Sequence, residues 1–407
     1  MNYLFIHQNF PGQFRHIAKL LADDPANEVI GIGNASNLKS KPVLHPRIRL
    51  LAYQPHQTGH KETHNYIRDF EGHIRRGQAV VRLLLKLRAE ESYKPDVIMV
   101  HPGWGEGLFL KDVFPQAKII HYFEFYYQGS GSDTGFDPEF PNTFDDQLRV
   151  RIKNSTQLHS LIGCDSGISP TNWQKTRYPT ELQHKIEVIH EGIDTTVVCP
   201  NPNASVTING KRFQLGDELI TYVARNLEPY RGIHTFMRSI PAIQSKRPNA
   251  RIIIVGGNDV SYGKKLPQGE TYRQRYCAEI NDMVDWSKVF FVANLPYADY
   301  LKVLQVSAAH VYLTYPFVLS WSMLEAMSAG CLLIASNMAP VKEVLEHGEN
   351  GLLFDFFDHE ELSMLVAQAL ENMTGYQKLR NSARNKIISD FDLSTVCMPK
   401  LLKKIAE

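Results

Sequence analysis

The stretch Tyr315-Pro-Phe-Val-Leu-Ser-Trp-Ser-Met-Leu-Glu-Ala-Met-Ser-Ala-Gly330 is the most informative part of the chain. It follows the apolar run His310–Tyr315 and precedes Leu332–Ser336, so the pattern predicts a strand, a loop, a short helix and another strand. One carboxylate, Glu325, stands among the apolar residues of that helix. Because a buried charge without a partner is costly, Glu325 is expected to meet water or a polar ligand. A loop and a helix N-terminus after a parallel strand are where open α/β sheets bind phosphate and ribose.

A second stretch of the same kind lies upstream. The apolar run Leu219–Ala224 ends in Arg225-Asn-Leu-Glu-Pro-Tyr-Arg-Gly-Ile-His234, which leads into an amphipathic segment. Arg225 and Arg231 therefore fall on a predicted strand-to-helix loop, and Gly232 lets the backbone approach a ligand closely. Guanidinium groups match pairs of phosphate oxygens, so the loop suits a diphosphate. Two solvated arginines on a surface loop are the alternative.

The composition predicts a soluble globular protein of more than one domain. The chain has 407 residues, 43% hydrophobic and 21% charged, which suits two domains of roughly 200 residues each. Its net charge of +1 argues against a general nucleic-acid binder. No leader pattern opens the chain, and no apolar run approaches the ~20 residues of a membrane span. We therefore expect a cytoplasmic protein without a zinc site, whose scattered cysteines are reduced thiols: Cys164, Cys199, Cys277, Cys331 and Cys397.

Strand-like and helix-like segments alternate along the chain, which predicts parallel, doubly wound sheets. Helices are expected between the strands, among them Gly105–Phe114 and Gln147–Ile162. The turn-rich segment Gly192–Ala204 predicts a domain boundary. The expected strands are Tyr3–His7, Glu28–Ile32, Arg47–Ala52, Val97–His101, Ala117–His121, Ser166–Ser169, Ile186–His190, Leu219–Ala224, Ala250–Val255, Val289–Ala293, His310–Tyr315 and Leu332–Ser336.

The stretch around Glu325 resembles the nucleotide-sugar signature of the retaining glycosyltransferases of family 4. In that signature a Glu, seven residues and a second Glu precede Ala-Met-Ala-x-Gly. Glu325 matches the second Glu, whereas Phe317 stands where the first is expected. The family's Arg and its usual Lys-Gly are matched by Arg225 and Arg231-Gly232. His190-Glu-Gly-Ile-Asp194 is similar to the family's Asn-Gly-Val-Asp, so the resemblance covers essentially the whole chain.

The resemblance implies an α/β fold of the GT-B type, in which two doubly wound, Rossmann-like domains face each other across a cleft. We expect an acceptor-side domain in residues 1–195 and a nucleotide-sugar-binding domain in residues 196–385. A C-terminal helix in residues 386–407 would cross back to the first domain. The implied reaction is a metal-independent transfer of a hexosyl group, with retention, from a nucleoside diphosphate sugar to a hydroxyl group. The acceptor would be a glycan, a lipid or another molecule, as in polysaccharide biosynthesis, and no cofactor is expected.

The resemblance also assigns roles to single residues. Arg225 and Arg231 would stabilise the departing diphosphate, His121 would position the sugar near the reacting carbon, and Glu325 would hold the ribose hydroxyls. Gly12 lies in the loop after the first strand, where a plain tight turn is an equally good interpretation. The further donor-binding residues would be Gly12, Gly232, Gly256, Phe317, Ser320, Ser322 and Leu324.

Two motifs in the first half suit a sugar-binding wall. His101-Pro-Gly-Trp-Gly-Glu-Gly107 follows a predicted strand, and sugar rings stack on an indole such as Trp104 while their hydroxyls bind a carboxylate such as Glu106. A structural turn with Trp104 packed on the next helix is the alternative. Glu124 is expected nearby, because it follows the strand that ends at His121.

The helix expected over residues 74–91 is basic and amphipathic. Such a face can lie on anionic lipid, which would place the protein peripherally at the inner face of the membrane. Any surface helix of an α/β domain has a similar pattern. Two other classes of function also fit the sequence: a GT-B sugar-nucleotide epimerase, and an inactive sugar-nucleotide-binding protein that has lost the first Glu at Phe317.

Overall fold

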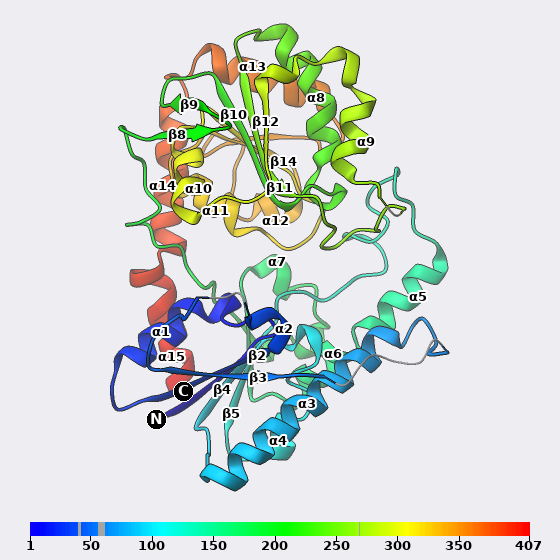
Figure 1. The fold of residues 1–407 in the computed structure, drawn as a ribbon, viewed down its shortest axis with the longest axis vertical. Helices are drawn as coiled ribbons and strands as arrows, with labels where there is room; N and C mark the ends of the chain where they lie inside the picture. The colour runs from blue at the N-terminus through cyan, green and yellow to red at the C-terminus, as the bar shows by residue number, and fades with distance from the viewer. Residues whose placement is uncertain (40–41, 56–61, 268) are drawn as a thin grey trace. The chain divides into compact units, whose positions relative to one another are not determined.

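The computed structural model describes residues 1–39, 42–55, 62–267 and 269–407, which form two compact units (Figure 1). Unit 1 comprises Met1–Glu191 and Cys397–Glu407, and unit 2 comprises Gly192–Val396. The C-terminal segment that packs with unit 1 thus begins at Cys397, later than the expected residue 386.

Unit 1 is built on a parallel sheet with the strand order β3-β2-β1-β4-β5-β6-β7. The order reverses between β1 and β4, because the chain first builds outward to β3 and then returns to the other side of β1. The strands are β1 (Asn2–Ile6), β2 (Glu28–Asn34), β3 (Ile48–Tyr53), β4 (Val97–Val100), β5 (Lys118–Tyr122), β6 (Ser166–Ser169) and β7 (Ile186–Val188).

The helices of unit 1 flank this sheet (Figure 1). Strand residues such as Leu4, Ile6 and Ile98 are fully buried, as in parallel sheets that are covered on both faces. The α-helices are α1 (Arg15–Asp23), α2 (Ala35–Leu38), α3 (Arg68–Glu91), α4 (Leu110–Val113), α5 (Phe144–Lys153), α6 (Ser155–Gly163), α7 (Asn172–Lys175) and α15 (Met398–Ala406). The 3-10 turns are η1 (Gly12–Phe14), η2 (Pro102–Trp104) and η3 (Thr180–Lys185).

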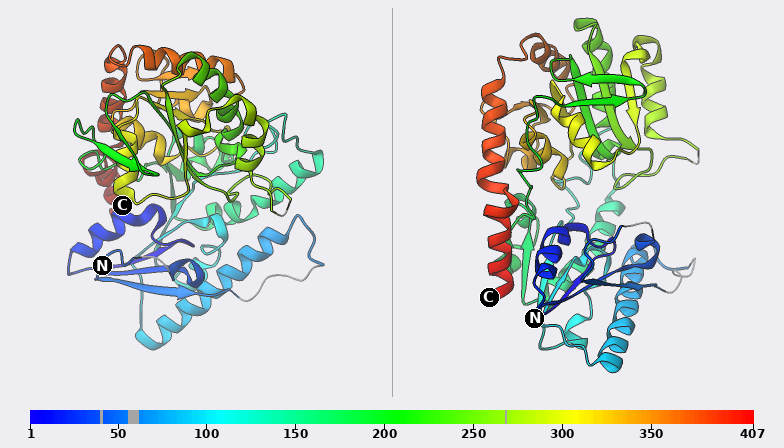
Figure 2. Two further views of the ribbon diagram at one scale, coloured as in Figure 1. Left: turned by 45° about the horizontal axis from the view of Figure 1, so that its top comes forward. Right: turned by 60° about the vertical axis from the view of Figure 1, so that its left-hand side comes forward.

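Helix α15 is joined to the sheet of unit 1 by a partly buried amine. Lys118 Nζ, on β5, donates hydrogen bonds to the carbonyl oxygens of Lys404 at 2.6 Å and Ile405 at 3.2 Å. These contacts occupy two of the carbonyls that a helix end leaves without an internal partner. Both chain termini consequently lie on unit 1 (Figure 2).

Unit 2 repeats the architecture with the parallel strand order β12-β11-β10-β13-β14-β15, which reverses between β10 and β13. The strands are β10 (Leu219–Asn226), β11 (Arg251–Gly257), β12 (Val289–Val292), β13 (Ala309–Tyr312), β14 (Leu333–Ser336) and β15 (Leu352–Phe354). The α-helices are α8 (Ile233–Lys246), α9 (Tyr272–Glu279), α10 (Tyr297–Gln305), α11 (Trp321–Ser328), α12 (Ala339–Lys342), α13 (His359–Glu371) and α14 (Gln377–Phe391). Shorter turns are η4 (Pro229–Arg231), η5 (Asn281–Met283), η6 (Trp286–Lys288) and the π-turn η7 (Leu393–Cys397).

Every expected strand is present, but two features of unit 2 were missed. An antiparallel hairpin, β8 (Ser205–Ile208) and β9 (Lys211–Gln214), follows the turn-rich boundary segment. Its turn is Asn209-Gly210, both with positive φ, which is the sequence signature of a two-residue hairpin loop. The short edge strand β15 was also not predicted.

Two expected helices were wrong in extent. The segment Gly105–Phe114 is helical in α4 alone. Its first residue, Gly105, cannot be helical because its φ is +96°, and an added Cβ there would lie 2.4 Å from the carbonyl oxygen of His73. Gln147–Ile162 is divided into α5 and α6 at Asn154. The Asn154 side chain accepts a hydrogen bond from the backbone N–H of Tyr127 at 3.0 Å and donates one to the carbonyl oxygen of Tyr127 at 2.7 Å.

We predict that Gly232→Ala destabilises unit 2 by about 2–5 kcal/mol, because left-handed backbone and overpacking both oppose the methyl group. Gly232 has φ +69°, and an added Cβ would lie 2.4 Å from Leu313 Cβ. Gly348→Ala is the matched control: φ is +78°, but no atom lies within 4 Å, so a loss of about 1–2 kcal/mol is expected. Urea-unfolding midpoints measure both, and equal losses would contradict the steric account.

Candidate functional site

A cavity of about 70 Å³ opens at the switch point of unit 2. The residues around it come from the end of β10, the β10–α8 loop, the β11–α9 loop, and the end of β13 with the start of α11. Four of the predicted site residues, Arg225, Arg231, Ser320 and Ser322, are thereby brought together. The lining residues are Val223, Ala224, Arg225, Asn226, Glu228, Arg231, Tyr262, Tyr312, Ser320 and Ser322.

Arg231 is half-buried in this cavity and held by neutral acceptors. Its Nη1 donates to Thr314 Oγ1 at 2.9 Å, to the Val318 carbonyl at 3.1 Å and to Tyr312 Oη at 3.3 Å. Within the described part of the chain, no carboxylate lies at ion-pair distance from this guanidinium. Burial opposes the charge, but Tyr312, Tyr262 and other acidic neighbours outweigh it and raise the pKa of Arg231. The cavity therefore contains a permanent cation whose direct partners are neutral oxygens, while the Glu228 carboxylate acts on it from beyond ion-pair distance.

Arg225 lies at an irregular place in β10. The pairing of β10 with β11 shifts register between Val223 and Asn226, and Arg225 is exposed there. Such irregularities redirect side chains at the ends of strands. Gly256, predicted to bind the donor, lies directly behind this loop, since an added Cβ would be 2.6 Å from Leu227 Cδ2. The close packing against Leu227 therefore explains why position 256 is a glycine.

Glu228 is a lining residue that the sequence reading missed. It is 1% exposed, and its carboxylate accepts hydrogen bonds from the backbone N–H groups of Ser261 at 3.0 Å, Tyr262 at 3.0 Å and Gly263 at 2.9 Å. This interaction fixes the β11–α9 loop, so that Tyr262 lines the cavity beside Arg231. The sequence placed Glu228 in a strand-to-helix loop, which could have indicated a lining residue, but it did not show the direction of the side chain.

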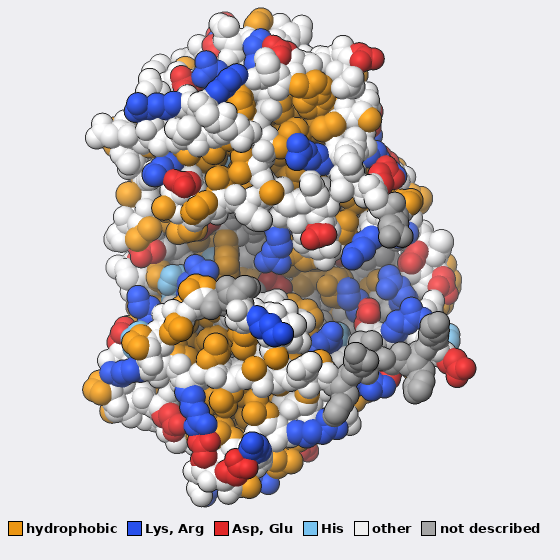
Figure 3. Space-filling view, in the orientation of Figure 1, with side chains coloured by type: hydrophobic (Ala, Val, Ile, Leu, Met, Phe, Trp, Pro, Cys, Tyr) orange, Lys and Arg blue, Asp and Glu red, His pale blue; other side chains and the backbone are white. Residues whose placement is uncertain are grey.

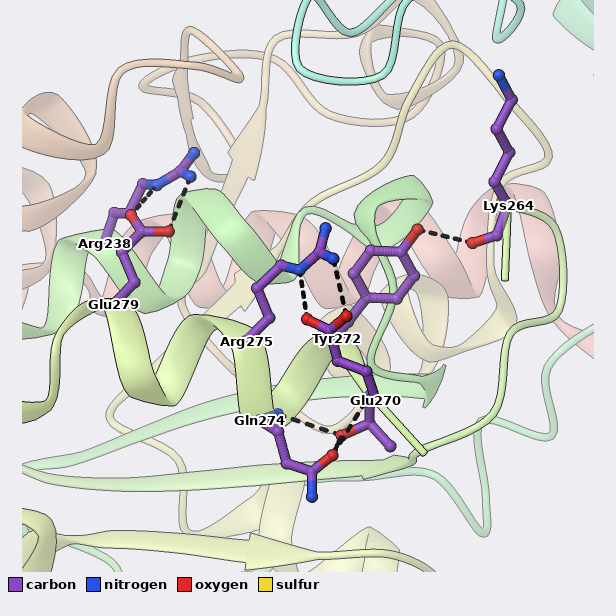
Figure 4. Close-up of polar contacts among 8 residues, drawn as sticks. Arg238, Lys264, Glu270, Tyr272, Gln274, Arg275 and Glu279 are labelled. Atoms are coloured by element: carbon purple, nitrogen blue, oxygen red, sulfur yellow. Dashed lines mark hydrogen bonds and ion pairs between the residues drawn. The ribbon is translucent and has the colours of Figure 1, made fainter. Parts of the chain in front are cut away.

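The far end of the same loop is also anchored (Figure 4). Tyr272 Oη donates to the carbonyl oxygen of Lys264 at 2.7 Å. Helix α9 is capped by Thr271, and Arg275 pairs with Glu270 just before it. The loop is thus held at Glu228 on one side and at α9 on the other.

Phe317 lies within an aromatic cluster next to Arg231. Its ring centroid is 4.8 Å from that of Tyr262 and 5.3 Å from that of Tyr230, and the ring is 2% exposed. The guanidinium carbon of Arg231 lies 5.9 Å from the Phe317 centroid. Phe317, which stands where the family has its first Glu, is therefore packed among aromatic side chains.

Glu325 lies one helical turn beyond Ser322 and is half-buried. Tyr297 Oη donates to its Oε1 and Tyr300 Oη to its Oε2, each at 2.7 Å. Burial, followed by the Glu325 carboxylate, raises the pKa of Tyr300, so this phenol remains a donor. The sequence reading missed both tyrosines. Leu324, predicted to bind the donor, is 1% exposed and belongs to the hydrophobic core of unit 2.

Several predicted residues of unit 1 lie in its interior. His121 is 2% exposed on β5, its ring stacks on Phe123, and burial lowers the pKa of its imidazole to about 3. Glu106 is 1% exposed; its carboxylate accepts a hydrogen bond from Tyr53, while burial raises its pKa. Glu106 therefore lies inside the domain and not at a surface wall.

Trp104 and Glu124 are each partly exposed, near the carboxyl ends of the adjacent strands β4 and β5. Gly12 has φ +49°, and an added Cβ would lie 2.4 Å from His7 Nε2, so the structure supports a tight turn there. The predicted wall thus retains Trp104 and Glu124 but not Glu106.

Several basic residues of α3 are engaged inside unit 1. Arg75 pairs with Glu71, Arg76 donates to the Trp104 carbonyl at 3.3 Å, and Arg88 donates to the Val113 carbonyl at 2.9 Å. On the face shown in Figure 3, acidic side chains lie among the basic ones. Over the described ranges, no helix combines the length and the apolarity needed to cross a bilayer.

Comparison with known families agrees with this geometry. Residues 25–198 match the family described as "Glycosyl transferase family 4 group", and residues 207–386 match "Glycosyl transferases group 1". The chain belongs to the family 4, group 1 glycosyltransferases. This glycosyltransferase is 25% identical to the glycogen synthase of Mycobacterium tuberculosis over 330 residues, which are 79% of this chain and 72% of that protein.

Further relatives extend the comparison. A GDP-mannose-dependent alpha-(1-6)-phosphatidylinositol monomannoside mannosyltransferase of the same organism is 26% identical over 46% of each chain. Among solved structures, Anabaena HepE in complex with UDP is similar with a TM-score of 0.67 at 16% identity, over 100% of both chains. Sucrose-phosphate synthase from Thermosynechococcus elongatus gives 0.71 at 16% identity, over 100% of this chain and 99% of that one. The glycosyltransferase has the GT-B fold, with two Rossmann-like domains.

We predict that Glu228→Gln loosens the β11–α9 loop, because the amide that replaces one carboxylate oxygen cannot accept from all three N–H groups. Hydrogen exchange at residues 261–263 should accelerate by about 10-fold or more, the equivalent of one lost charged hydrogen bond. Glu279→Gln, at the exposed carboxylate on α9 that is paired with Arg238, is the control and should leave these amides unchanged. Unchanged exchange in Glu228→Gln would disprove the anchoring role.

Proposed function

We propose that this glycosyltransferase moves a sugar from a nucleoside diphosphate donor to an acceptor hydroxyl with retention of configuration, and that unit 2 holds the nucleotide. The observation that carries the proposal is Arg231, a cation held by the neutral oxygens of Thr314, Val318 and Tyr312 in a cavity at the switch point. Switch points are where doubly wound sheets bind nucleotides, and guanidinium groups bind phosphate oxygens in pairs. Arg225 and the start of α11 border the same cavity.

The proposed reaction depends on stabilising the negative charge of the departing diphosphate. When the bond between the anomeric carbon and the phosphate oxygen breaks, negative charge builds on the diphosphate, and Arg225 and Arg231 would stabilise it. The acceptor oxygen forms its bond on the same face of the sugar, and its proton passes to the departing phosphate. Glu228 is the lining carboxylate of the cavity, and its three backbone donors leave it poorly suited to attack the sugar. This supports a direct mechanism over a covalent intermediate, with no cofactor or metal required.

Two observations guide the choice of donor nucleotides to test. HepE was solved with UDP and with UDP-glucose, which makes uridine nucleotides the first to test. Glu325 would hold the ribose, with Tyr297 and Tyr300 fixing its carboxylate. The role of His121 near the reacting carbon remains a prediction from the resemblance.

Phe317 bears on the sugar itself. A phenyl ring accepts no ordinary hydrogen bond, so we propose that the donor sugar lacks a hydroxyl at that position or uses Ser320 or Ser322 instead. The aromatic neighbours Tyr230 and Tyr262 support a retained apolar contact over simple loss of function. A deoxy or acetamido sugar would suit this apolar cluster, in which Tyr262 is an exposed ring.

For the cellular site we propose the cytoplasm, which the free thiols of Cys164, Cys199, Cys277 and Cys331 support. The engaged arginines of α3 give no support to a lipid contact by that helix.

Arg231→Ala and Arg225→Ala should each weaken UDP binding by about 1.5–3 kcal/mol, the range for charge-assisted hydrogen bonds, while uridine binding barely changes. Arg238→Ala is the matched control, because this arginine of unit 2 is paired with Glu279 on α9 (Figure 4). Titration calorimetry measures all three. Wild-type affinity in both cavity variants, for UDP and for the other nucleoside diphosphates, would refute the phosphate assignment.

Phe317→Glu should lower turnover with the native donor, because it places a charge inside an aromatic cluster and against an apolar edge of the sugar. Donor hydrolysis without acceptor gives the readout: a transferase releases nucleoside diphosphate slowly, an epimerase alters the sugar, and an inactive binder does neither. An increase of activity on every donor tested would rule out the apolar contact.

A further inference from the structure

The phenol of Tyr312 is a buried polar group of the unit 2 cavity. Tyr312 is the last residue of β13, it lines the cavity, and it is 2% exposed. Its place in an apolar strand is typical of a core residue, so nothing in the sequence distinguished it from its neighbours. A buried hydroxyl needs hydrogen-bond partners, because an unpaired buried donor is costly. The partners of this hydroxyl therefore indicate what it does.

Both partners of the Tyr312 oxygen are hydrogen-bond donors. The backbone N–H of Ser320, the N-cap residue of α11, donates to Tyr312 Oη at 3.0 Å. Arg231 Nη1 donates to the same atom at 3.3 Å. Neither an amide N–H nor a guanidinium can accept a proton in return. Among the residues that the structure describes, the phenol O–H therefore has no acceptor.

The same two contacts restrict the direction of the phenol proton. A hydroxyl group carries one proton and two acceptor lone pairs, and the two donors occupy the acceptor side of this oxygen. The proton turns away from both donors, because their positively polarised hydrogens repel it. Since Tyr312 lines the cavity, the cavity is where an acceptor can reach this proton.

Arg231 and Arg225 present further donors to the same space. All three hydrogen bonds of the Arg231 side chain use Nη1, so its Nη2 and Nε have no partner within the described ranges. Arg225 also lines the cavity. Tyr312 thus adds a neutral donor to two cations. Phosphate oxygens accept several hydrogen bonds each, so a phosphate can use guanidinium and hydroxyl donors together.

We propose that Tyr312 is a phosphate-binding residue of the donor site, and that its phenol O–H donates to a phosphate oxygen of the nucleoside diphosphate. The inference rests on the proposed function and extends it beyond the motif residues. Tyr312 lies outside both motif stretches, Tyr315–Gly330 and Arg225–His234. It differs from the two arginines because it acts by direction and not by charge.

The first test compares two variants that each remove an oxygen bonded to Arg231. Tyr312→Phe keeps the ring and removes the phenol, whereas Thr314→Val removes the acceptor at 2.9 Å, the shorter contact. Thr314 is not among the described residues that line the cavity. We expect Tyr312→Phe to weaken UDP binding about tenfold or more without changing uridine binding, and Thr314→Val to weaken UDP binding less than about threefold.

This comparison separates a direct contact from support of the arginine. If Tyr312 acted only by holding Arg231, Thr314→Val would lose at least as much affinity, because it removes the shorter of the two hydrogen bonds. Equal losses, a larger loss in Thr314→Val, or wild-type affinity in Tyr312→Phe overturn the proposal. Titration calorimetry measures all of these affinities.

A second test keeps the hydroxyl group and changes only its strength. 3-Fluorotyrosine incorporated at position 312 is a stronger donor and a weaker acceptor than tyrosine, because fluorine withdraws electron density from the phenol oxygen. The titration is done at about pH 6, where a phenol keeps its proton. We expect UDP to bind about two- to threefold more tightly, as a stronger donor requires. Unchanged or weaker binding would show that the oxygen serves only as an acceptor, and would overturn the proposal.

The inference and the proposed function can fail separately. UDP, GDP and ADP are first titrated against the wild-type chain, and the diphosphate that binds most tightly is used in both tests with its own nucleoside. Absence of binding by all three contradicts the proposed function, and this inference with it. Weakened binding in Arg231→Ala together with wild-type affinity in Tyr312→Phe contradicts the inference alone.

Discussion

Parallel strand direction is the constraint on which both candidate sites depend. Because every strand of the two large sheets runs the same way, all their carboxyl ends meet at one edge, and the loops after them gather there. In unit 2 this collects Arg225, Tyr262 and Ser320 from three separate loops. In unit 1 it collects His7 and His101. Each set lies where the strand order reverses, because loops on the two sides of that point turn away from each other and leave space between them.

The charge in the unit 2 cavity is arranged for an anion. Arg231 is held by a hydroxyl, a phenol and a carbonyl, so its positive charge is oriented but not cancelled. Glu228 lines the same space, yet its negative charge is met by three backbone donors. A carboxylate satisfied in this way orders the loop while competing little with a phosphate for the arginine.

The neighbours of Glu325 and Phe317 determine what each of these two motif residues can bind. Both oxygens of Glu325 accept phenol hydrogen bonds, so a ribose would use the remaining lone pairs of the carboxylate or displace a tyrosine. Phe317 occupies the place of an expected acid, and the rings of Tyr230 and Tyr262 pack against it to form an apolar contact surface. Under the proposed function, donor specificity would depend on this cluster rather than on one position.

The sequence by itself determined every strand of the two large sheets except β15, together with their parallel arrangement and the loops that carry Arg225, Arg231 and Ser320. These features follow from local periodicity and from the order of segments along the chain. It did not determine which way the carboxylates point. Glu106 and Glu124 follow neighbouring strands, but Tyr53 draws the first into the interior and Gln13 holds the second near the surface. Tyr300 on Glu325 and His101 beside Glu124 were likewise invisible. Their partners lie tens of residues away in the chain, so only tertiary packing could bring donor and acceptor within hydrogen-bond distance.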